Sequence, residues 1–429
     1  MKIFVYDEFG PEDTAMMQAL YSRSALSVEE HVEKVKKSGS GKFMERFYVG
    51  YGHASIADCG STTIFIEDVS MLVAKAVQDW GLYSGQETSS RYIDLSKREI
   101  KDPVNTKESK KILDKWMKFY TESQPAVEAH LKEKYKRKPD EDEAVYDKAI
   151  KARVFDIMRG FLPAGITTQL SWHTNLRQVH DKLDLLKHHP LAEIREVAET
   201  ILAQLKTKYK NSFAHPFAGD QEEYREFLGK KYTYFSEKNY DGDFTYKTNI
   251  KNAELEKYSD VLEKRPARTG LPHFLTELGN ITFDFLLDFG SFRDIQRHRN
   301  GVCRMPLLTT KLGFNNWYLE QLPADLKIEA EKLIKEQVAE ISKLKSSPED
   351  LQYYIGMGFN VSCRVSYALP ACVYVVELRS GKLVHPTLRR VAHNMDKALR
   401  AMFPKLLLHC DLNPDDWDVR RGMQDIKER

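Results

Sequence analysis

Apolar residues recur every three or four positions along most of the chain, a spacing typical of amphipathic helices that pack on a core. In the first half, a strand-like stretch at residues 62–67 leads into a helix whose apolar positions run from Val69 to Trp80. In the second half, Phe289, Phe292 and Ile295 form one apolar face of a helix, and Gly301 is placed to end it. The pattern therefore predicts many helices with a smaller share of strand.

Longer charged helices are predicted elsewhere in both halves. They are expected near residues 107–120, 140–155, 192–205, 325–345 and 388–402. Residues 213–244 are rich in Tyr, Phe, Lys and Gly, which indicates a connection between the halves. Its aromatic residues predict that it packs on a surface, unlike a flexible Gly/Ser tether.

Composition limits the classes of function. A length of 429 residues suits two domains, and a net charge of +2 provides no global basic field of the kind that nucleic-acid binders use. Any attraction for phosphate must therefore be local, and nucleic acid is not an expected partner. The opening M-K-I-F-V-Y-D lacks the apolar stretch of a signal peptide, and no run has membrane-spanning length. The expected location is the cytoplasm, with no membrane partner.

Several familiar site motifs are absent from the sequence. The five cysteines are scattered with no C-x-x-C and no histidine at ligand spacing, so no metal site is predicted. Neither a P-loop nor a G-x-G-x-x-G after a strand is present. Cys303 lies close to a basic motif, where a catalytic thiol is one interpretation and a packed thiol, the commoner role, is the favoured one.

That basic motif is Arg297-His298-Arg299, at the end of the predicted helix. Adjacent cations repel one another, so the tripeptide is a poor structural device but a good grip for the phosphates of a dinucleotide. The alternative is a solvated basic helix end. Two further stretches of the sequence favour the phosphate grip.

The first stretch is G-H-A-S-I-A-D at residues 52–58, followed by a strand, a helix and a second group of polar residues. That group is Ser84, Gln86, Glu87, Ser89, Arg91 and Tyr92. It resembles the second half of the R-H-R-x-x-S motif of flavin-dependent thymidylate synthases. Asp79-Trp80-Gly81 stands where the family has R-H-R, whereas the second stretch, residues 281–310, keeps R-H-R but has Leu307 and Thr309 in place of the serine and arginine.

The resemblance implies roles for further residues. R-G-F-L-P followed by W-H-T-N-L-R matches a family segment and assigns Arg159 to the nucleotide, with Asn175 and Arg177 at the flavin. A family arginine at the pyrimidine falls at Leu186 in the first half, and Arg379 supplies it in the second. The implied flavin-binding set is His53, Ser55, Asp58, Asn175, Arg177, Arg297, His298 and Arg299. The implied substrate-binding set is Glu87, Ser89, Arg91, Arg159, Arg297 and Arg379, of which Arg159, Arg297 and Arg379 are the candidate catalytic residues.

The resemblance also implies an architecture. Residues 1–215 and 250–429 would be two tandem copies of the family domain, joined by residues 216–249, each an α+β domain with a small, mainly antiparallel sheet flanked by helices. Neither copy is complete, but the halves are complementary, with the nucleotide-binding residues in the first and the R-H-R grip in the second. Family members are tetramers whose sites are shared between subunits, so the chain is expected to form a homodimer that imitates a tetramer.

The implied activity is the FAD-dependent reductive methylation of dUMP to dTMP, with methylenetetrahydrofolate and NADPH as co-substrates. Two alternatives stay open at this point. The first alternative is a flavin- or nucleotide-binding relative without methylation activity. The second is a flavoenzyme that acts on another pyrimidine.

Overall fold

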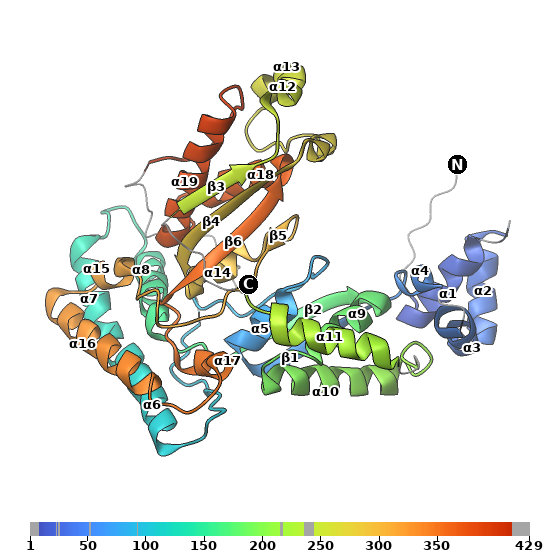
Figure 1. The fold of residues 1–429 in the computed structure, drawn as a ribbon, viewed down its shortest axis with the longest axis horizontal. Helices are drawn as coiled ribbons and strands as arrows, with labels where there is room; N and C mark the ends of the chain where they lie inside the picture. The colour runs from blue at the N-terminus through green and yellow to red at the C-terminus, as the bar shows by residue number, and fades with distance from the viewer. Residues whose placement is uncertain are drawn as a thin grey trace. The chain divides into compact units, whose positions relative to one another are not determined.

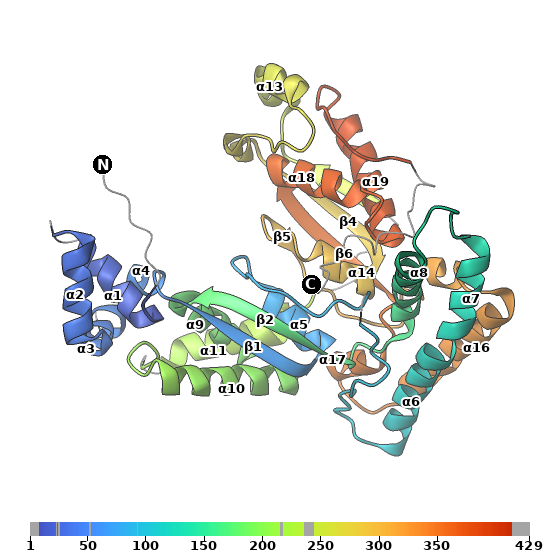
Figure 2. The same ribbon diagram turned by 180° about the vertical axis from the view of Figure 1, so that it is seen from behind.

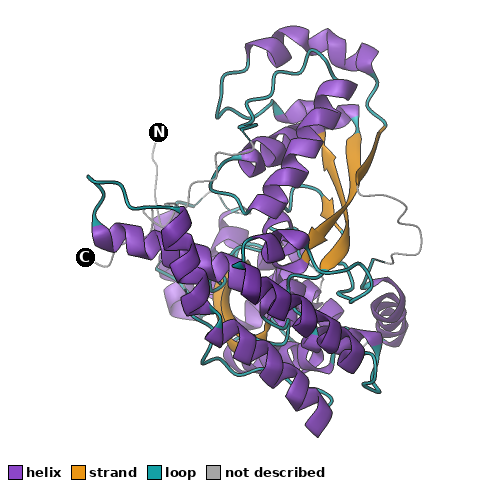
Figure 3. Cartoon of the chain, turned by 90° about the vertical axis from the view of Figure 1, so that its left-hand side faces the viewer, coloured by secondary structure: helices purple, strands orange, loops and turns teal. Residues whose placement is uncertain are grey.

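The computed structural model describes residues 8–22, 24, 26–50, 53–91, 93–214, 218–235 and 244–413. Helices make up most of this part of the chain, and the strands are confined to two small sheets (Figure 3). One sheet has two strands, and the other has four in the order β3-β4-β6-β5. The expected mixed α+β fold with small antiparallel sheets is confirmed.

The chain divides into two compact units that alternate along the sequence. Unit 1 comprises residues 1–67, 73–87 and 169–233, and unit 2 comprises residues 68–72, 88–168 and 234–429. Both units draw on the first predicted repeat, so this division differs from the predicted repeats, whose limits stay a prediction. Among the described residues, no helix is long and apolar enough to cross a bilayer.

Unit 1 is built around the two-stranded sheet. Its elements are α1 (Pro11–Tyr21), α2 (Val28–Ser38), α3 (Gly41–Phe43), η1 (Met44–Gly50), α4 (Ala54–Ala57), α9 (Leu176–Leu186), α10 (Ala192–Lys208) and α11 (Gly219–Tyr232). Strand β1 (Ser61–Ser70), helix α5 (Met71–Gln78) and strand β2 (Thr167–Asn175) belong partly to each unit. Both ribbon views show α9, α10 and α11 lying together beside β1 and β2 (Figures 1 and 2). Helix α11 occupies part of the predicted connection.

Unit 2 contains the larger sheet and the remaining helices. They are α6 (Lys107–Glu122), α7 (Gln124–Lys134), α8 (Glu143–Met158), η2 (Arg159–Phe161), β3 (Phe244–Thr248), α12 (Asn252–Leu255), η3 (Glu256–Tyr258), α13 (Ser259–Lys264), η4 (His273–Leu278), β4 (Asn280–Asp288), α14 (Phe289–Ile295), β5 (Val302–Cys303), α15 (Asn316–Glu320), α16 (Ala324–Ile341), α17 (Pro348–Leu351), η5 (Gln352–Tyr354), β6 (Asn360–Ala368), α18 (Leu369–Ser380) and α19 (Pro386–Met402). The predicted helices near residues 110, 145, 195, 335 and 395 are confirmed as α6, α8, α10, α16 and α19.

The core of unit 2 forms because β4 and β6 alternate in burial. They pair antiparallel from Asn280 opposite Ala368 to Asp288 opposite Asn360. Successive side chains of a strand point to opposite faces, so every second residue of each strand is buried. Helices α18 and α19 cover one face of this sheet, and α14 follows directly from β4 (Figure 1). The sheet thus fixes where the end of α14 lies.

A short segment after α8 pairs with a segment after α17 in a symmetric way. Residues 160–165 run antiparallel to residues 353–358 within unit 2. Two of the backbone hydrogen bonds run from Ala164 N–H to the Ile355 carbonyl at 2.9 Å and from Met357 N–H to the Leu162 carbonyl at 2.8 Å. A shift of 193 positions turns 164 into 357 and 162 into 355, so each bond is converted into the other. Such an exchange is the signature of a local two-fold axis.

The connection from strand to helix also recurs, and its acceptor residues are related by the same shift. Met71, the first residue of α5, donates its N–H to the carbonyl of Ile166 at 3.1 Å. Phe289, the first residue of α14, donates to the carbonyl of Phe359 at 3.0 Å. Residues 166 and 359 again differ by 193. The same backbone frame therefore occurs twice in the chain.

Candidate functional site

Helix α14 is fixed at its beginning by a buried acidic cap. Asp288 is the N-cap residue, and its Oδ2 accepts hydrogen bonds from Ser291 N–H at 2.8 Å and from the Tyr318 hydroxyl at 2.7 Å. An aspartate at this position satisfies a backbone donor that has no partner within the helix. The helix ends at Ile295, so the Arg-His-Arg tripeptide lies just beyond its C-terminal end, where cations are favoured.

The carboxylate of Asp294 lies between two arginines. Its Oδ2 is 3.5 Å from Nη2 of Arg91, and its Oδ1 is 3.6 Å from Nη1 of Arg297. Nε of Arg91 also lies 3.0 Å from Oδ1 of Asp156, which is fully buried on α8. Residues from both halves of the sequence therefore meet at this carboxylate.

Arg379 on α18 approaches the same turn from another side. Its Nη2 donates to the backbone carbonyl of Asp294 at 2.8 Å, and its Nε donates to Nε2 of His298 at 2.7 Å. An imidazole nitrogen that accepts a hydrogen bond is unprotonated, so the His298 proton lies on Nδ1. Burial, and then the charge of Arg379, lower the pKa of His298 to about 3. His298 is therefore neutral near pH 7.

Arg159 reaches the region from within the core. It is only 2% exposed, and its Nη2 donates to the Ser291 hydroxyl at 2.8 Å, with Nε 3.5 Å from the Tyr318 hydroxyl. Burial works to lower the pKa of the guanidinium, but Tyr318, Asp288 and Asp294 raise it overall. The positive charge of Arg159 is thus stabilised by these neighbouring side chains rather than by solvent.

We call Arg91, Arg159, Arg297 and Arg379 the arginine cluster. Burial alone would raise the pKa of the Asp294 carboxyl, but Arg91, Arg297, Arg159 and Arg379 together hold it far below its usual range. These are the four arginines that the sequence analysis assigned to the nucleotide. The cluster carries four positive charges against three negative charges from Asp156, Asp288 and Asp294, an excess of one. This part of unit 2 is suited to an anion.

The serines beside Arg91 order its turn. The Ser89 hydroxyl accepts a hydrogen bond from Arg91 N–H at 3.3 Å, and the Ser90 hydroxyl accepts one from Nη1 of buried Arg293 at 3.2 Å. Arg299 donates to the carbonyl of Arg297 at 3.4 Å. Ser89 and Arg299 therefore lie on the same backbone segments as the arginine cluster. Tyr92 of the sequence motif lies outside the described residues.

Glu87 takes a different position, in unit 1. Its Oε2 lies 3.0 Å from Nζ of Lys75 and accepts a hydrogen bond from Nε2 of Gln78 at 2.8 Å. The side chains of Lys75 and Glu87 are 1% and 2% exposed, so this is a buried ion pair. The substrate-binding role assigned to Glu87 stays a prediction.

The other flavin-binding candidates are also in unit 1. Arg177 pairs with Asp58 through two contacts of 2.7 Å, and Asn175 caps α9 by accepting from Gln178 N–H at 2.8 Å. His53 and Ser55 are exposed at the beginning of α4. The structure thus brings Asp58 and Arg177 together, two residues that the sequence analysis assigned to the same cofactor.

Sequence reasoning missed the acidic partners of the arginines. Asp294 lies three positions before Arg297, a spacing at which side chains of opposite charge meet on a helix, so a local signal was present. Asp156, Asp288 and Tyr318 carry no comparable local signal, because only the packing of α8, α14 and α15 brings them near the arginines. Among the described residues, no group of His, Cys, Asp and Glu is arranged to hold a metal ion.

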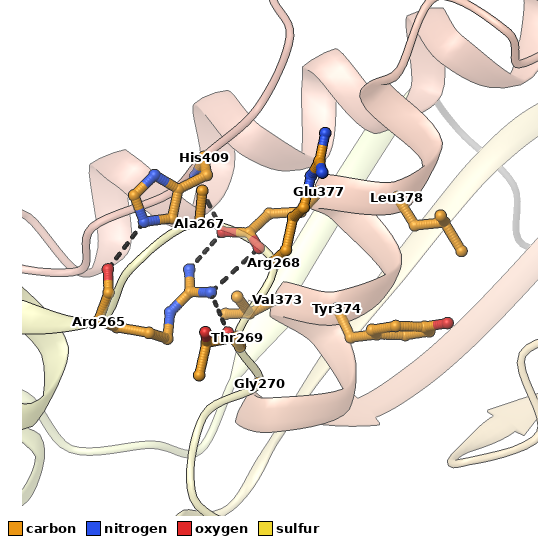
Figure 4. Close-up of a pocket in the computed structure, with 10 residues that line it drawn as sticks. All are labelled: Arg265, Ala267, Arg268, Thr269, Gly270, Val373, Tyr374, Glu377, Leu378 and His409. Carbon is orange, nitrogen blue, oxygen red and sulfur yellow. Dashed lines mark hydrogen bonds and ion pairs between the residues drawn. The ribbon is translucent and has the colours of Figure 1, made fainter.

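A pocket of about 490 Å³ opens beside α18 in the same unit. Arg265 closes one side, since its buried guanidinium pairs with Glu377 (Figure 4). The backbone N–H of His409 also donates to the Glu377 carboxylate, at 2.9 Å. The exposed ring of Tyr374 lines the pocket and meets the His298 ring edge-on, with 6.1 Å between the ring centroids. The pocket therefore adjoins the Arg-His-Arg segment and offers it an aromatic surface.

Comparison with known proteins relates the first half of the chain to a family. Residues 6–209 match the model of the family described as thymidylate synthase complementing protein. A flavin-dependent thymidylate synthase of Pyrococcus furiosus is 26% identical over 46% of this chain and 74% of its own length. The resemblance of the first half is thus confirmed, whereas the family model does not cover the second predicted copy.

Other relatives extend over most of the chain. A UPF0159 protein of Chlamydia muridarum is 26% identical over 84% of this chain and 79% of its own length. The UPF0159 protein Ta1429 of Thermoplasma acidophilum is 22% identical over 92% of this chain and 94% of its own length. Relatives that match most of this chain therefore occur in distant organisms.

Proposed function

We propose that the chain is an enzyme similar to the flavin-dependent thymidylate synthases, which methylates dUMP reductively to dTMP with methylenetetrahydrofolate. The observation that carries the proposal is the arginine cluster, in which four arginines from both halves of the sequence act on one carboxylate. A uridylate is an anion with two carbonyl oxygens on a planar ring, and guanidinium groups bind both phosphate and carbonyl oxygens in fixed geometry.

Within this proposal, the chain binds and orients the nucleotide. Arg91 and Ser89 hold the phosphate, with Arg159 as the remaining nucleotide-binding arginine. Arg379 stabilises the negative charge that develops on a pyrimidine carbonyl oxygen, because a fixed cation in a partly buried site acts without reorganising solvent. His298 stays neutral and keeps Arg379 in place through the 2.7 Å hydrogen bond.

FAD is the proposed cofactor, and the fit is supported by the cations at the end of α14. Arg297 is 48% exposed and therefore accessible to phosphate oxygens, and Arg299 lies half-buried two residues beyond it. When bound, the reduced flavin supplies the hydride that converts the transferred methylene carbon into a methyl group, and NADPH restores the reduced flavin. Asp58, Arg177, Asn175, His53 and Ser55 of unit 1 are proposed to complete the flavin contacts.

We also propose that the chain arose as a tandem of two family domains and forms a homodimer. The support is the repeated frame, in which backbone hydrogen bonds are exchanged by a shift of 193 residues. The order of strand, helix, further helices, short 3₁₀ helix, strand and helix occurs from β1 to α9 and again from β4 to α18, where the two-residue strand β5 is added after α14. A duplicated domain would produce this local two-fold relation within one chain.

One observation favours a second candidate, a flavin- or nucleotide-binding protein without methylation activity. Arg177 and Asp58, both assigned to the flavin, form an ion pair with each other, and Asp294 faces the arginines assigned to the nucleotide. Under this alternative the anion site is retained, and the reaction is lost. A flavoenzyme for another pyrimidine differs only in its substrate.

Two measurements separate these candidates. Purified protein is examined for flavin absorbance and for flavin released on denaturation, and then assayed for tritium release from dUMP labelled at carbon 5 of the uracil ring. Yellow protein that releases tritium only with methylenetetrahydrofolate and NADPH supports the synthase. Yellow protein that is stabilised thermally by dUMP but releases no tritium supports the binding protein. Colourless protein that dUMP does not stabilise contradicts both.

A further inference from the structure

Asp294 stands where an anionic ligand of the arginine cluster would be expected. Its two carboxylate oxygens face different arginines, Arg91 and Arg297, while its own carbonyl accepts from Arg379. One residue therefore contacts three of the four arginines.

The carboxylate contacts are loose ones. Hydrogen bonds between a guanidinium and a carboxylate usually span about 2.7–2.9 Å. The distances from Asp294 to Arg91 and Arg297 are 3.5 and 3.6 Å, whereas the Asp58–Arg177 contacts in unit 1 measure 2.7 Å. Asp294 thus neutralises charge at this site without binding either arginine tightly.

The side chains of Arg91 and Arg297 are more exposed than the carboxylates that they face. Arg297 is 48% exposed and Arg91 is 21% exposed, whereas Asp294 is 13% exposed and Asp156 is fully buried. An anion arriving from solvent therefore meets the guanidinium groups first. It would then lie within a few ångströms of the Asp294 carboxylate, and like charges at that range repel.

We propose that Asp294 is a built-in counter-ion of the arginine cluster, which holds Arg91 and Arg297 together without ligand and competes with the phosphate group of a ligand for them. The inference rests on the phosphate-binding part of the proposed function and needs neither flavin nor methylation. It makes Asp294 a specificity-determining residue, because its charge sets how strongly the site favours a dianionic phosphate over a neutral nucleoside.

The proposal predicts opposite effects of one substitution on stability and on binding. In Asp294→Asn the arginines lose their counter-ion, so the ligand-free protein melts a few degrees lower because of mutual repulsion. The same change removes the repulsion of phosphate, so affinity for inorganic phosphate rises about tenfold or more. A residue with only a structural role would lower both.

The test uses the full chain and inorganic phosphate as the probe. Affinity is measured by isothermal titration, and the melting temperature is measured with and without phosphate, for the wild type and for Asp294→Asn, Asp294→Glu and Arg297→Gln. Asp294→Glu keeps the charge and should remain close to the wild type. Arg297→Gln should bind phosphate more weakly than the wild type.

Asp284→Asn is the matched control. Asp284 pairs with Arg364 at 2.6 and 3.0 Å on the sheet of the same unit, and it is about as buried as Asp294, with 16% exposed. Removing its charge should leave the phosphate affinity unchanged. If it raised the affinity as much as Asp294→Asn does, the effect would be one of net charge and the proposal would be overturned.

The remaining outcomes also decide the matter. Unchanged or weaker phosphate binding in Asp294→Asn, or phosphate binding by neither wild type nor variant, overturns the counter-ion. If Asp294→Asn does not fold, the other two variants decide. A lowered phosphate affinity in Asp294→Glu would overturn the proposal. Unchanged phosphate affinity in Asp294→Glu, together with weaker phosphate binding in Arg297→Gln, would support it. Tritium release by the wild type is measured separately, so failure of the synthase proposal is a distinct result.

Discussion

The helix after β1 and the helix after β4 share a backbone frame but differ in how their charges are balanced. Lys75 on α5 is buried and satisfied by Glu87 and Gln78, so that ion pair carries no net charge. Helix α14 instead carries Asp294 and is followed by Arg297, in a region where arginines exceed aspartates. The charges near α5 are thus paired within the core, whereas the region near α14 keeps an excess of positive charge.

The segments that follow the two helices differ in the same way. Asp79-Trp80-Gly81 is held within unit 1, since the Asp79 carbonyl accepts from buried Lys182 at 2.7 Å and the Trp80 indole donates to Gln178 at 3.0 Å. Burial lowers the pKa of Lys182 to about 8. Arg297, in the other segment, is half-exposed. The segment after α5 is thus packed within unit 1, whereas the segment after α14 exposes a cation.

The largest expected effect concerns the buried ion pair of Lys75 and Glu87. Lys75→Met leaves the Glu87 carboxylate buried without its cationic partner, and breaking a buried pair costs about 3–5 kcal/mol of the free energy of unfolding. Urea unfolding of the purified protein measures this loss. Lys75→Met combined with Glu87→Gln should recover most of it, because no charge is left buried. A double variant as unstable as the single one would show that packing, and not the charge, sets the cost.

A smaller effect is expected at the arginine cluster, where two substitutions should affect the flavin and dUMP separately. Arg297→Gln should weaken flavin retention roughly ten- to a hundredfold, because a hydrogen bond to a charged group contributes about 1.5–3 kcal/mol. Arg91→Gln should weaken dUMP binding to a similar extent and leave the flavin absorbance intact. Flavin content after gel filtration and dUMP titration measure the two effects.

The corresponding substitution in the other segment is the control. Asp79→Asn should change neither flavin retention nor dUMP affinity, since unit 1 holds that segment by its backbone and by Trp80. Equal losses of both ligands in Arg297→Gln and Arg91→Gln would contradict the proposed division between flavin and nucleotide.

The effect expected to be smallest for a change of one pH unit is the contribution of His298 to stability. The pKa of His298 is about 3 in the folded protein and roughly 6.5 in an unfolded chain, so between these values only the unfolded state gains the proton. Stability therefore falls as the pH falls from about 6.5 to about 3, by about 1.4 kcal/mol per pH unit for this group.

His298→Gln tests that contribution. Glutamine can still accept from Arg379 but does not titrate, so the acid-side slope should decrease by one proton. Denaturant unfolding at several pH values, compared with the wild type, cancels the contributions of His189 and His385. An unchanged slope would show that His298 titrates normally.

The sequence by itself determined the local features of this protein. Helical spacing located α6, α8, α10, α16 and α19, because an amphipathic helix must repeat its apolar positions to reach a core. The motif residues alone also indicated the relation of the first half to the thymidylate synthase complementing proteins, which the family match confirms over residues 6–209. The sequence also proposed the arginines, because a phosphate grip needs that residue type, and their binding role stays a prediction.

Only the tertiary structure decided what those arginines face. Arg91 and Asp294 are far apart in sequence, and it is the packing of α8, α14 and α18 within unit 2 that places Asp156, Asp294 and Arg379 near Arg91. Glu87 belongs to the same short motif as Arg91, yet it pairs with Lys75 in the other unit. A motif specifies residue types along the chain, but charge partners are chosen by which side chains the fold brings within a few ångströms of one another.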